Sequence, residues 1–369
     1  AFTFAVRGGS GRCADDGAVT FRFFYFHSYP HRCHCKLTNI MLTILSLLSF
    51  AAGLGRALTS PPAGALVVGG KDYAKIQDAV DILNTTSTKE QLIFIEAGTY
   101  HEQVDIPALS GPLTVYGYSE DTSSYVDNEV VITYSDALAN EDNDYATATL
   151  RARTSDFKMY NVDVKNTYGQ ADTDGQALAI SAEAEKQGYY GCGFYGYQDT
   201  VLADSGAQLY AKCYIEGATD FIFGQRAAAW FDACDIRVLE APLGFITASG
   251  RSSNDTSYYV INNSTVAAAD GADVPSGAYY LGRPWHEYAR VVFQGTSMSE
   301  VVNPAGWSVW SPTDPQIDHV TFAEYNNSGA GSEGTRASFA STLNEPVLIT
   351  EVLGSDYEDM AYVDPAYLA

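Results

Sequence analysis

Two aspartates, Asp199 and Asp220, lie 21 residues apart, and three cysteines repeat at the same spacing at Cys192, Cys213 and Cys234. If each such segment is one coil of a solenoid, equivalent positions stack on adjacent parallel strands about 4.8 Å apart. The two carboxylates then lie one above the other. Because carboxylates this close do not both ionise easily, one tends to keep a proton and act as a general acid, while the other can attack or abstract.

Amide, guanidinium and aromatic side chains accompany the two aspartates. Gln198 directly precedes Asp199, and either Gln198 or Gln176 can donate a hydrogen bond to an oxyanion without adding charge. Arg283, in the segment YLGRPW, is a candidate for keeping one aspartate ionised. The nearby Trp285 offers a flat apolar face to a sugar ring. Such a set can work with a carboxylate nucleophile and a carboxylate acid and base, without metal, cofactor or histidine.

Other common catalytic arrangements are missing from the sequence. There is no G-x-S-x-G elbow, no H-E-x-x-H motif and no glycine-rich phosphate loop. After the first 40 residues the histidines are only His101, His286 and His319, which leaves few candidates for a Ser-His-Asp triad. The carboxylates are therefore the best candidates for catalysis.

Apolar residues share the register of the cysteines, since Phe194, Ile215 and Ile236 also align. One coil cannot bury its apolar face alone, so stacked coils bury a continuous core. We therefore predict an all-β fold, a right-handed parallel β-helix (solenoid), with a short helix over 73–83 that caps its N-terminal end. The segment after about residue 310 should lie along the outside of the coil or form its far cap. The strand-like runs are 92–95, 113–116, 130–134, 159–164, 177–181, 193–197, 208–216, 230–239, 258–262 and 290–293.

The chain is strongly acidic. Among its 369 residues are 21 basic and 45 acidic ones, which give a formal net charge of −24 and a pI near 4.4. Such a field repels nucleic acid and anionic membrane surfaces, so we expect neither as a partner. No linker or low-complexity tract divides the chain beyond its N-terminal region, and we expect one domain that acts as a monomer.

The N-terminal region differs from the rest, because its first 40 residues hold five basic and only two acidic residues. Met41 then opens an apolar run, 42–54, that is too short to span a bilayer but is typical of a signal peptide. We predict that residues 1–40 are a non-native upstream extension and 41–57 a signal peptide. Residues 58–369 are then the single domain of a secreted, extracellular protein.

Two further features bear on this assignment. A cluster of metal-ligand types occurs at His31, Cys33, His34 and Cys35, but it lies upstream of the predicted signal peptide and lacks a second spaced pair, so we expect no metal site. N-x-S/T sequons fit secretion as glycan acceptors, and they occur at Asn84, Asn254, Asn262, Asn263 and Asn326.

The three stacked cysteines leave two interpretations open. Their predicted Cα separation falls within the range of a disulfide, so Cys213 could bridge Cys192 or Cys234 and leave one thiol. Alternatively, all three are free thiols that pack as small apolar groups. Neither interpretation makes them catalytic.

At this point the sequence resembles a known family. The segments GQA at 175–177, GYQDT at 196–200, DFIFG at 220–224 and LGRPW at 281–285 look like those of the pectin methylesterases (pectinesterases), in order and spacing. An earlier stretch, IFIEAGTYHEQV at 93–104, is also similar, and the resemblance covers residues 66–365. It points to a secreted, microbial or fungal-like member.

The resemblance implies hydrolysis of methyl esters on galacturonate units of pectin (homogalacturonan), with release of methanol. Asp220 is then the nucleophile, and Asp199 is first the acid and then the base. Gln198 and Gln176 stabilise the oxyanion, and Arg283 orients Asp220. Substrate contacts are implied for Arg283, Trp285, Phe223 and Tyr197.

Rival functions come from other classes. A pectate lyase or polygalacturonase would share the solenoid and the polymer but would cleave its backbone, the lyase with calcium. A glycosidase also uses two carboxylates, although the adjacent Gln-Asp and the LGRPW segment favour ester chemistry. A non-catalytic polysaccharide-binding protein is the remaining alternative, because a fold alone does not establish a function.

Overall fold

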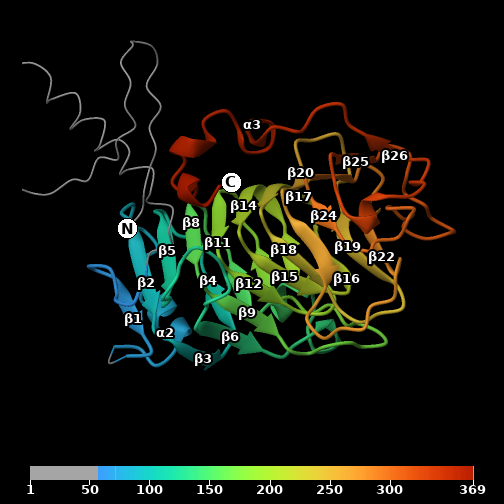
Figure 1. The fold of residues 1–369 in the computed structure, drawn as a ribbon. Helices are drawn as coiled ribbons and strands as arrows, with labels where there is room; N and C mark the ends of the chain where they lie inside the picture. The colour runs from blue at the N-terminus through green and yellow to red at the C-terminus, as the bar shows by residue number, and fades with distance from the viewer. Residues whose placement is uncertain (1–56, 71, 369) are drawn as a thin grey trace, which may run out of the picture. The chain divides into compact units, whose positions relative to one another are not determined.

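The computed structural model describes residues 57–70 and 72–368, and their strands form three sheets of parallel strands (Figure 1). The eleven-stranded sheet runs β1 (Leu66–Val68), β2 (Gln91–Ile95), β5 (Leu113–Gly117), β8 (Phe157–Tyr160), β11 (Gln187–Tyr190), β14 (Ser205–Ala211), β17 (Arg226–Asp232), β20 (Tyr258–Asn262), β23 (Arg290–Gln294), β25 (Thr321–Tyr325) and β26 (Ala340–Thr342). The seven-stranded sheet runs β22 (Tyr279–Pro284), β19 (Gly244–Ser249), β16 (Thr219–Gly224), β13 (Val201–Ala203), β10 (Ile180–Ala182), β7 (Leu150–Ala152) and β4 (Val104–Ile106). The eight-stranded sheet runs β24 (Ser297–Met298), β21 (Thr265–Ala268), β18 (Asp235–Val238), β15 (Tyr214–Gly217), β12 (Gly193–Tyr195), β9 (Asp163–Asn166), β6 (Val130–Tyr134) and β3 (Gly98–His101). The chain visits the sheets in turn, so the predicted parallel β-helix is confirmed.

The 21-residue register is confirmed, but only at the centre of the coil. Phe194 pairs with Ile215, and Ile215 pairs with Ile236, each 21 positions later. On either side the coils are longer, since Val164 pairs with Phe194 and Ile236 pairs with Val266, each 30 positions later. The extra residues lie in loops between strands. This difference explains why the sequence shows the period over three coils only.

A tight turn with one left-handed residue, called here the one-residue turn, follows β8, β11, β14, β17, β20, β23 and β25, and the first six of these strands pass through it into the eight-stranded sheet. Its residue has a left-handed φ near +50 to +60 in successive coils, and the set is Asn161, Gly191, Lys212, Ala233, Asn263, Gly295 and Asn326. The runs predicted as single strands at 159–164, 208–216 and 230–239 cross this turn, so each was wrong as one strand. The turn requires only one left-handed residue and no cluster of glycine or proline. Where that residue is Lys212 or Ala233, nothing in the sequence indicates a turn.

The three cysteines are buried free thiols, which decides between the two interpretations in favour of the unbridged ladder. Cys192 Sγ donates to the carbonyl of Met159 at 3.4 Å, and Cys213 Sγ donates to that of Tyr189 at the same distance. They lie inside the coil beside the stacked side chains of Phe194, Ile215 and Ile236, and they pack as small apolar groups.

The predicted capping helix is present but shorter, as α2 (Ile76–Asp81), and it buries Ile76, Ala79 and Val80 against the core. The Glu102 carboxylate accepts hydrogen bonds from the backbone N–H groups of Ile76 and Gln77, each at 3.0 Å. These bonds satisfy two free donors at the helix start, where a negative charge is favourable.

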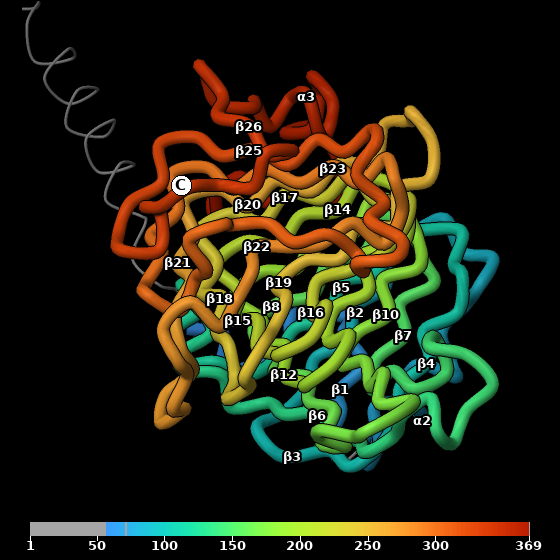
Figure 2. Tube along the Cα trace, turned by 90° about the vertical axis from the view of Figure 1, so that its right-hand side faces the viewer, coloured from blue at the N-terminus to red at the C-terminus, as the bar shows by residue number. Residues whose placement is uncertain are grey.

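The C-terminal segment both extends and covers the coil. β25 and β26 add to the eleven-stranded sheet, and the following chain lies across its outer face, where α3 (Ile349–Leu353) contacts β14 and β17 (Figures 1 and 2). The predicted outer position of the C-terminal segment is therefore confirmed.

The described residues also form short 3-10 turns, which are η2 (Leu138–Asn140), η3 (Asp144–Thr147), η4 (Ala330–Ser332), η5 (Tyr357–Asp359) and η6 (Pro365–Tyr367).

Several predictions concern residues outside those that the structure describes. These are the extension at 1–40, the signal peptide at 41–57 apart from Ala57, and the cluster at His31, Cys33, His34 and Cys35. Within the described residues, no helix is long and apolar enough to cross a membrane. In the same part of the chain, no group of three or more His, Cys, Asp or Glu side chains is arranged to hold a metal ion.

Four of the five sequons lie at exposed asparagines, at Asn84, Asn254, Asn263 and Asn326. Asn262 differs because its Nδ2 donates to Asp232 at 2.6 Å and its Oδ1 accepts from Gln294 at 2.9 Å. A glycan on Asn262 would break this ladder of side-chain hydrogen bonds, so the structure favours the other four as acceptors.

Candidate active site

Asp199 and Asp220 occupy equivalent places on the two central coils. Gln198 pairs with Thr219, and the backbone N–H of Asp199 donates to the Thr219 carbonyl at 3.0 Å. Both aspartates have a left-handed φ, 63° and 51°, and the pairing of β16 with β19 shifts register beside Asp220. Such strained positions and bulges redirect side chains and are frequent at functional sites. The two aspartates therefore hold equivalent positions on neighbouring coils, as the 21-residue spacing predicted.

Arg283, at the end of β22, holds Asp220 in a two-point ion pair. Its Nε lies 2.9 Å from Oδ1 and its Nη2 lies 2.6 Å from Oδ2. The guanidinium lies between two aromatic rings, with its carbon 4.2 Å from the centre of Phe245 and 4.3 Å from that of Trp310. Both aromatic contacts favour the cation and restrict its rotation, so the arginine is fixed as a partner for Asp220.

The two carboxyl groups differ in their electrostatic surroundings. Burial and then the neighbouring Asp220 charge raise the pKa of Asp199 well above its ordinary value, and Asp144 adds to this effect. Burial also raises the pKa of Asp220, but the hydrogen bonds and charge of Arg283 oppose that rise. At a pH between the two pKa values Asp199 is therefore protonated while Asp220 is ionised. This separation suits an acid and a nucleophile.

The two glutamines lie on neighbouring coils beside the aspartates. The backbone N–H of Ala177 donates to the carbonyl of Gln198 at 3.1 Å, which places Gln176 next to Gln198. The Gln198 amide oxygen lies 3.2 Å from the point where a side chain on Gly175 would begin, so the glycine leaves room for it. The Gln176 amide oxygen is buried and has no hydrogen-bond partner among the described residues. A buried polar group left free in this way is a candidate for contact with a bound molecule.

Trp285 and Phe223 lie on an apolar strip on the outer face of the seven-stranded sheet. The strip consists of Ala148, Leu178, Leu202, Phe223 and Ala248, with Tyr145 and Trp285 packed against it. Phe223 is only 3% exposed, and its ring centre lies 6.3 Å from that of Trp285. Trp285 is the more accessible of the two predicted contacts, and Phe223 mainly supports it.

Tyr197 is the predicted site residue that the structure places apart from this set. Its hydroxyl lies 3.4 Å from the carbonyl of Glu240, in the loop between β18 and β19, and its ring packs against the interior core. Burial raises its pKa, as does the charge of Glu240. The structure thus brings together seven of the eight predicted residues.

Four residues of the site were not found from the sequence, namely Asp144, Tyr145, Phe245 and Trp310. Asp144 and Tyr145 lie in η3, within the long connection between β6 and β7, and Trp310 lies between β24 and β25. Phe245 belongs to β19 and is displaced from the 21-residue register by the longer loop before it. No spacing or motif in the sequence marks these positions.

Comparison with known proteins gives consistent results. A family model described as Pectinesterase matches residues 66–344. The chain is 57% identical to a pectinesterase of Aspergillus niger over 329 residues, which cover 88% of this chain and 98% of the relative. It is 55% identical to a pectinesterase of Aspergillus aculeatus over 331 residues, with the same coverage of 88% and 98%. The structure is similar to that of the pectin methylesterase from Aspergillus niger in deglycosylated form, with a TM-score of 0.77 and 39% identity over 83% of this chain and 98% of that chain.

Proposed function

The chain belongs to the pectinesterase family and is a carboxylic ester hydrolase that removes methyl esters from pectin, and on that premise we propose how its side chains divide the reaction. Asp220 is the nucleophile, Asp199 is the acid and base, and Gln198 and Gln176 stabilise the oxyanion. Arg283 keeps Asp220 ionised and oriented. The observation that carries the proposal is the two-point contact of Arg283 with Asp220. Asp199, whose pKa is raised well above its ordinary value, lies one coil away.

The first half of the reaction transfers the galacturonyl group to the enzyme. A carboxylate oxygen of Asp220 attacks the ester carbonyl carbon, and the carbonyl electron pair moves to oxygen. Amide N–H groups of Gln198 and Gln176 donate to this oxyanion. When the tetrahedral intermediate collapses, the bond to the methoxy oxygen breaks, and Asp199 gives that oxygen its proton. Methanol leaves, and an acyl anhydride on Asp220 remains.

The second half of the reaction restores the enzyme. Asp199 is now ionised and takes a proton from a water molecule, whose oxygen attacks the galacturonyl carbonyl carbon. The anhydride bond breaks toward Asp220, which leaves as a carboxylate. The product forms as a galacturonic acid carboxyl group, which releases the second water proton to solvent and becomes a carboxylate, and Asp199 is again protonated. Both carboxyl groups therefore return to their starting states.

Trp285 is proposed as the side chain that a galacturonate ring contacts, with Phe223 behind it and Arg283 at the edge of the same surface. Tyr197 has the weakest case, because its hydroxyl is directed to the Glu240 carbonyl. A Tyr197→Phe substitution should therefore change the KM for pectin less than Trp285→Ala does, and steady-state kinetics compare the two.

The proposal extends to the protein's surroundings. We propose residues 58–369 as a secreted, monomeric domain that acts on extracellular pectin, after loss of a signal peptide at 41–57, with residues 1–40 outside the natural chain. The acidic charge argues against nucleic acid or anionic membranes as partners. N-terminal sequencing of protein secreted by a eukaryotic host, with translation started at Met41, should find a mature end close to residue 58.

Methanol release from highly methylated pectin tests the catalytic assignment, with EDTA present and viscosity recording backbone cleavage. The parent chain should release methanol without lowering viscosity. Asp220→Asn should reduce the rate by roughly 10³-fold or more. Asp199→Asn should reduce it by roughly 10²–10⁴-fold, the range of a lost general acid.

Asp235→Asn is the matched control for these variants, because Asp235 pairs with Arg237 on the eight-stranded sheet. It should keep the parent rate. Falling viscosity would indicate a depolymerase, and a fully active Asp220→Asn variant would contradict the assignment of the nucleophile.

A further inference from the structure

The outer face of the seven-stranded sheet continues beyond the apolar strip toward the N-terminal end of the coil. Successive strands place one residue each in a single column, which runs Arg283, Ala248, Phe223, Leu202, Ser181, Arg151 and Asp105. Ile180 and Ala182, which flank Ser181 in the chain, belong to the interior core. Because side chains alternate along a strand, the column that contains Ser181 faces outward. A polymer lying along the column would pass from the catalytic residues over the apolar strip to a charged end.

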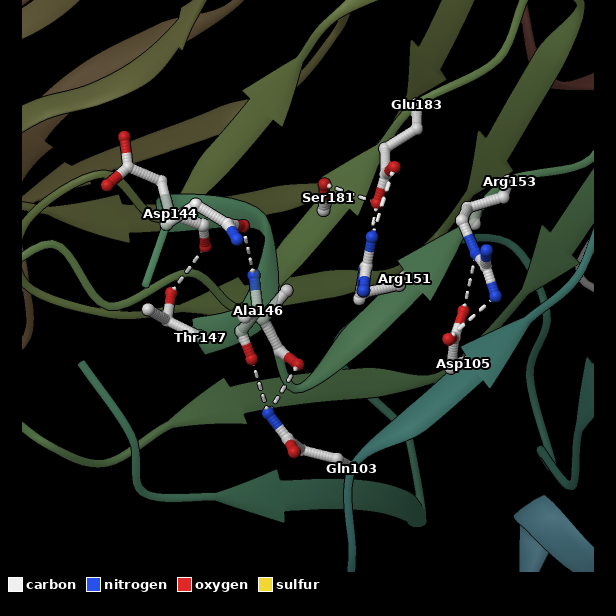
Figure 3. Close-up of polar contacts among 12 residues, drawn as sticks. Gln103, Asp105, Asp144, Ala146, Thr147, Arg151, Arg153, Ser181 and Glu183 are labelled. Carbon is white, nitrogen blue, oxygen red and sulfur yellow. Dashed lines mark hydrogen bonds and ion pairs between the residues drawn. The ribbon is translucent and has the colours of Figure 1, made fainter. Parts of the chain in front are cut away.

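Ion pairs fill this charged end (Figure 3). Arg151 on β7 donates through Nε and Nη2 to the two carboxylate oxygens of Glu183, at 2.9 and 3.3 Å. Ser181 donates to the same carboxylate at 3.1 Å. Arg153 pairs in the same two-point manner with Asp105, with both distances 2.7 Å. Both guanidinium groups are therefore neutralised by carboxylates of the chain itself.

A pocket of about 230 Å³ opens beside Arg151, and its lining also includes Gln103, Asp105 and Glu141. Gln103 donates to the carbonyls of Ala146 and Ala148, which holds the end of η3 against this wall. Asp105 and Glu141 line the pocket together with Arg151, and Arg151 is already paired with Glu183 outside the lining. The pocket therefore has polar groups for sugar hydroxyls but no free cation for a uronate carboxylate.

We propose that Glu183 is a specificity-determining residue, which neutralises Arg151 so that the charged end of the column accepts a methyl-esterified galacturonate and disfavours a free one. The inference rests on the proposed function. A neutral ester requires no counter-charge, whereas a free carboxylate would meet an arginine whose Nε and Nη2 donors are occupied, beside uncompensated negative charge. Opposing a like charge without a partner is an effective means of discrimination.

The test measures kcat/KM per methyl ester at low salt for each variant on two substrates, which are highly methylated pectin and randomly half de-esterified pectin. Glu183→Gln frees Arg151 and should raise the ratio of the second value to the first by about five- to tenfold, mainly through KM. Arg151→Gln leaves Glu183 unpaired and should lower the same ratio. Glu183→Asp keeps the charge and should preserve the parent ratio. High salt should reduce the differences, because the charges are partly exposed.

Asp235→Asn is again the matched control. The Arg237–Asp235 pair has side-chain exposures of 25% and 20%, close to the 26% and 17% of Arg151–Glu183, but lies on another sheet. Asp235→Asn removes one negative charge, as Glu183→Gln does, and should leave the ratio of the two kcat/KM values unchanged. An unchanged ratio in both Glu183→Gln and Arg151→Gln would overturn the proposal, and Arg151→Gln decides alone if the other variant does not fold. Failure of the proposed function would appear separately, as no methanol from highly methylated pectin with the parent chain.

Discussion

The two short coils at the centre of the protein and the longer coils on either side contribute different parts of the active site. The central coils carry Gln198, Asp199 and Asp220, which are three of the four groups proposed to react or to hold the oxyanion, and Gln176 lies in the longer connection between β9 and β10. The longer coils carry Arg283 and Asp144, which alter the pKa values of those groups. The reacting groups thus sit where the chain has no spare residues, and the groups that adjust them come from strand ends and loops.

The central coils hold their side chains by backbone constraint. Asp199 and Asp220 both have a left-handed φ, which costs energy in a residue other than glycine. The two coils are also tied to each other here, since the backbone N–H of Asp199 donates to the Thr219 carbonyl and that of Thr219 donates to the Tyr197 carbonyl. The outer coils use aromatic stacking and ion pairs instead, as Phe245 and Trp310 do for Arg283.

Substitution of Arg283 should separate the two contributions most sharply. Arg283→Gln removes the outer coil's cation but leaves the central coils intact, so the fold should persist while kcat/KM for pectin falls by about 10²–10³-fold. Arg283 lowers the pKa of Asp220. Without it that pKa rises, less Asp220 is ionised at a given acidic pH, and the acid limb of the pH–rate profile moves to higher pH. Methanol release across pH measures both effects.

Arg283→Lys is the matched variant, because it keeps the charge but loses the two-point contact and the planar stacking. It should restore the position of the acid limb more than the rate. A Gln variant with an unmoved acid limb would show that the outer coil does not tune the nucleophile.

A substitution at Gly217 should disturb the central coils directly. A Cβ added to Gly217 would lie 2.3 Å from the Cβ of Phe221, next to the proposed nucleophile. Gly217→Ala should therefore destabilise the protein by about 1–3 kcal/mol through overpacking, and it should also lower activity. Chemical denaturation followed by circular dichroism measures the first effect. Gly70→Ala is the control, since its nearest neighbour is a Val67 methyl at 3.7 Å, and it should change neither quantity appreciably.

The same contrast explains what could be predicted from the sequence. The fold and the stacking of the aspartates and cysteines were predictable because the central coils repeat without insertions, whereas the spacing did not decide between free and bridged cysteines. Sequence motifs located Arg283 and Trp285, although their distance from Asp220 in the chain gave no geometric clue. Asp144 and Trp310 were missed, because residues in long loops follow no period and their contacts depend on the completed fold.

The one-residue turn offers a smaller test of the central coils. Outer coils place Asn or Gly at this left-handed position, but the central coils have Lys212 and Ala233 there, with φ of 54° and 50°. Alanine pays about 1–2 kcal/mol for this conformation, and glycine avoids that cost at some loss of chain entropy. Ala233→Gly should therefore raise the free energy of unfolding by about 0.5–1 kcal/mol. Thermal and denaturant unfolding measure it, and a destabilised variant would contradict the idea that the central turn is strained.

The smallest expected effect concerns the influence of a loop residue, Asp144, on the pKa of Asp199, the proposed acid and base. The charge of Asp144, from the long connection before β7, contributes to the raised pKa of Asp199, after burial and Asp220. Asp144→Asn removes that charge, so Asp199 ionises more easily and its pKa falls. The acid form then disappears at a lower pH, and the alkaline limb of the pH–rate profile should move to lower pH, while the rate at the optimum stays within roughly twofold. Asp142→Asn, two residues earlier on the same loop but exposed, is the control and should leave the limb in place. If both variants moved the limb equally, the general acidity of the loop would be responsible, and the outer coil would act on Asp199 through no particular residue.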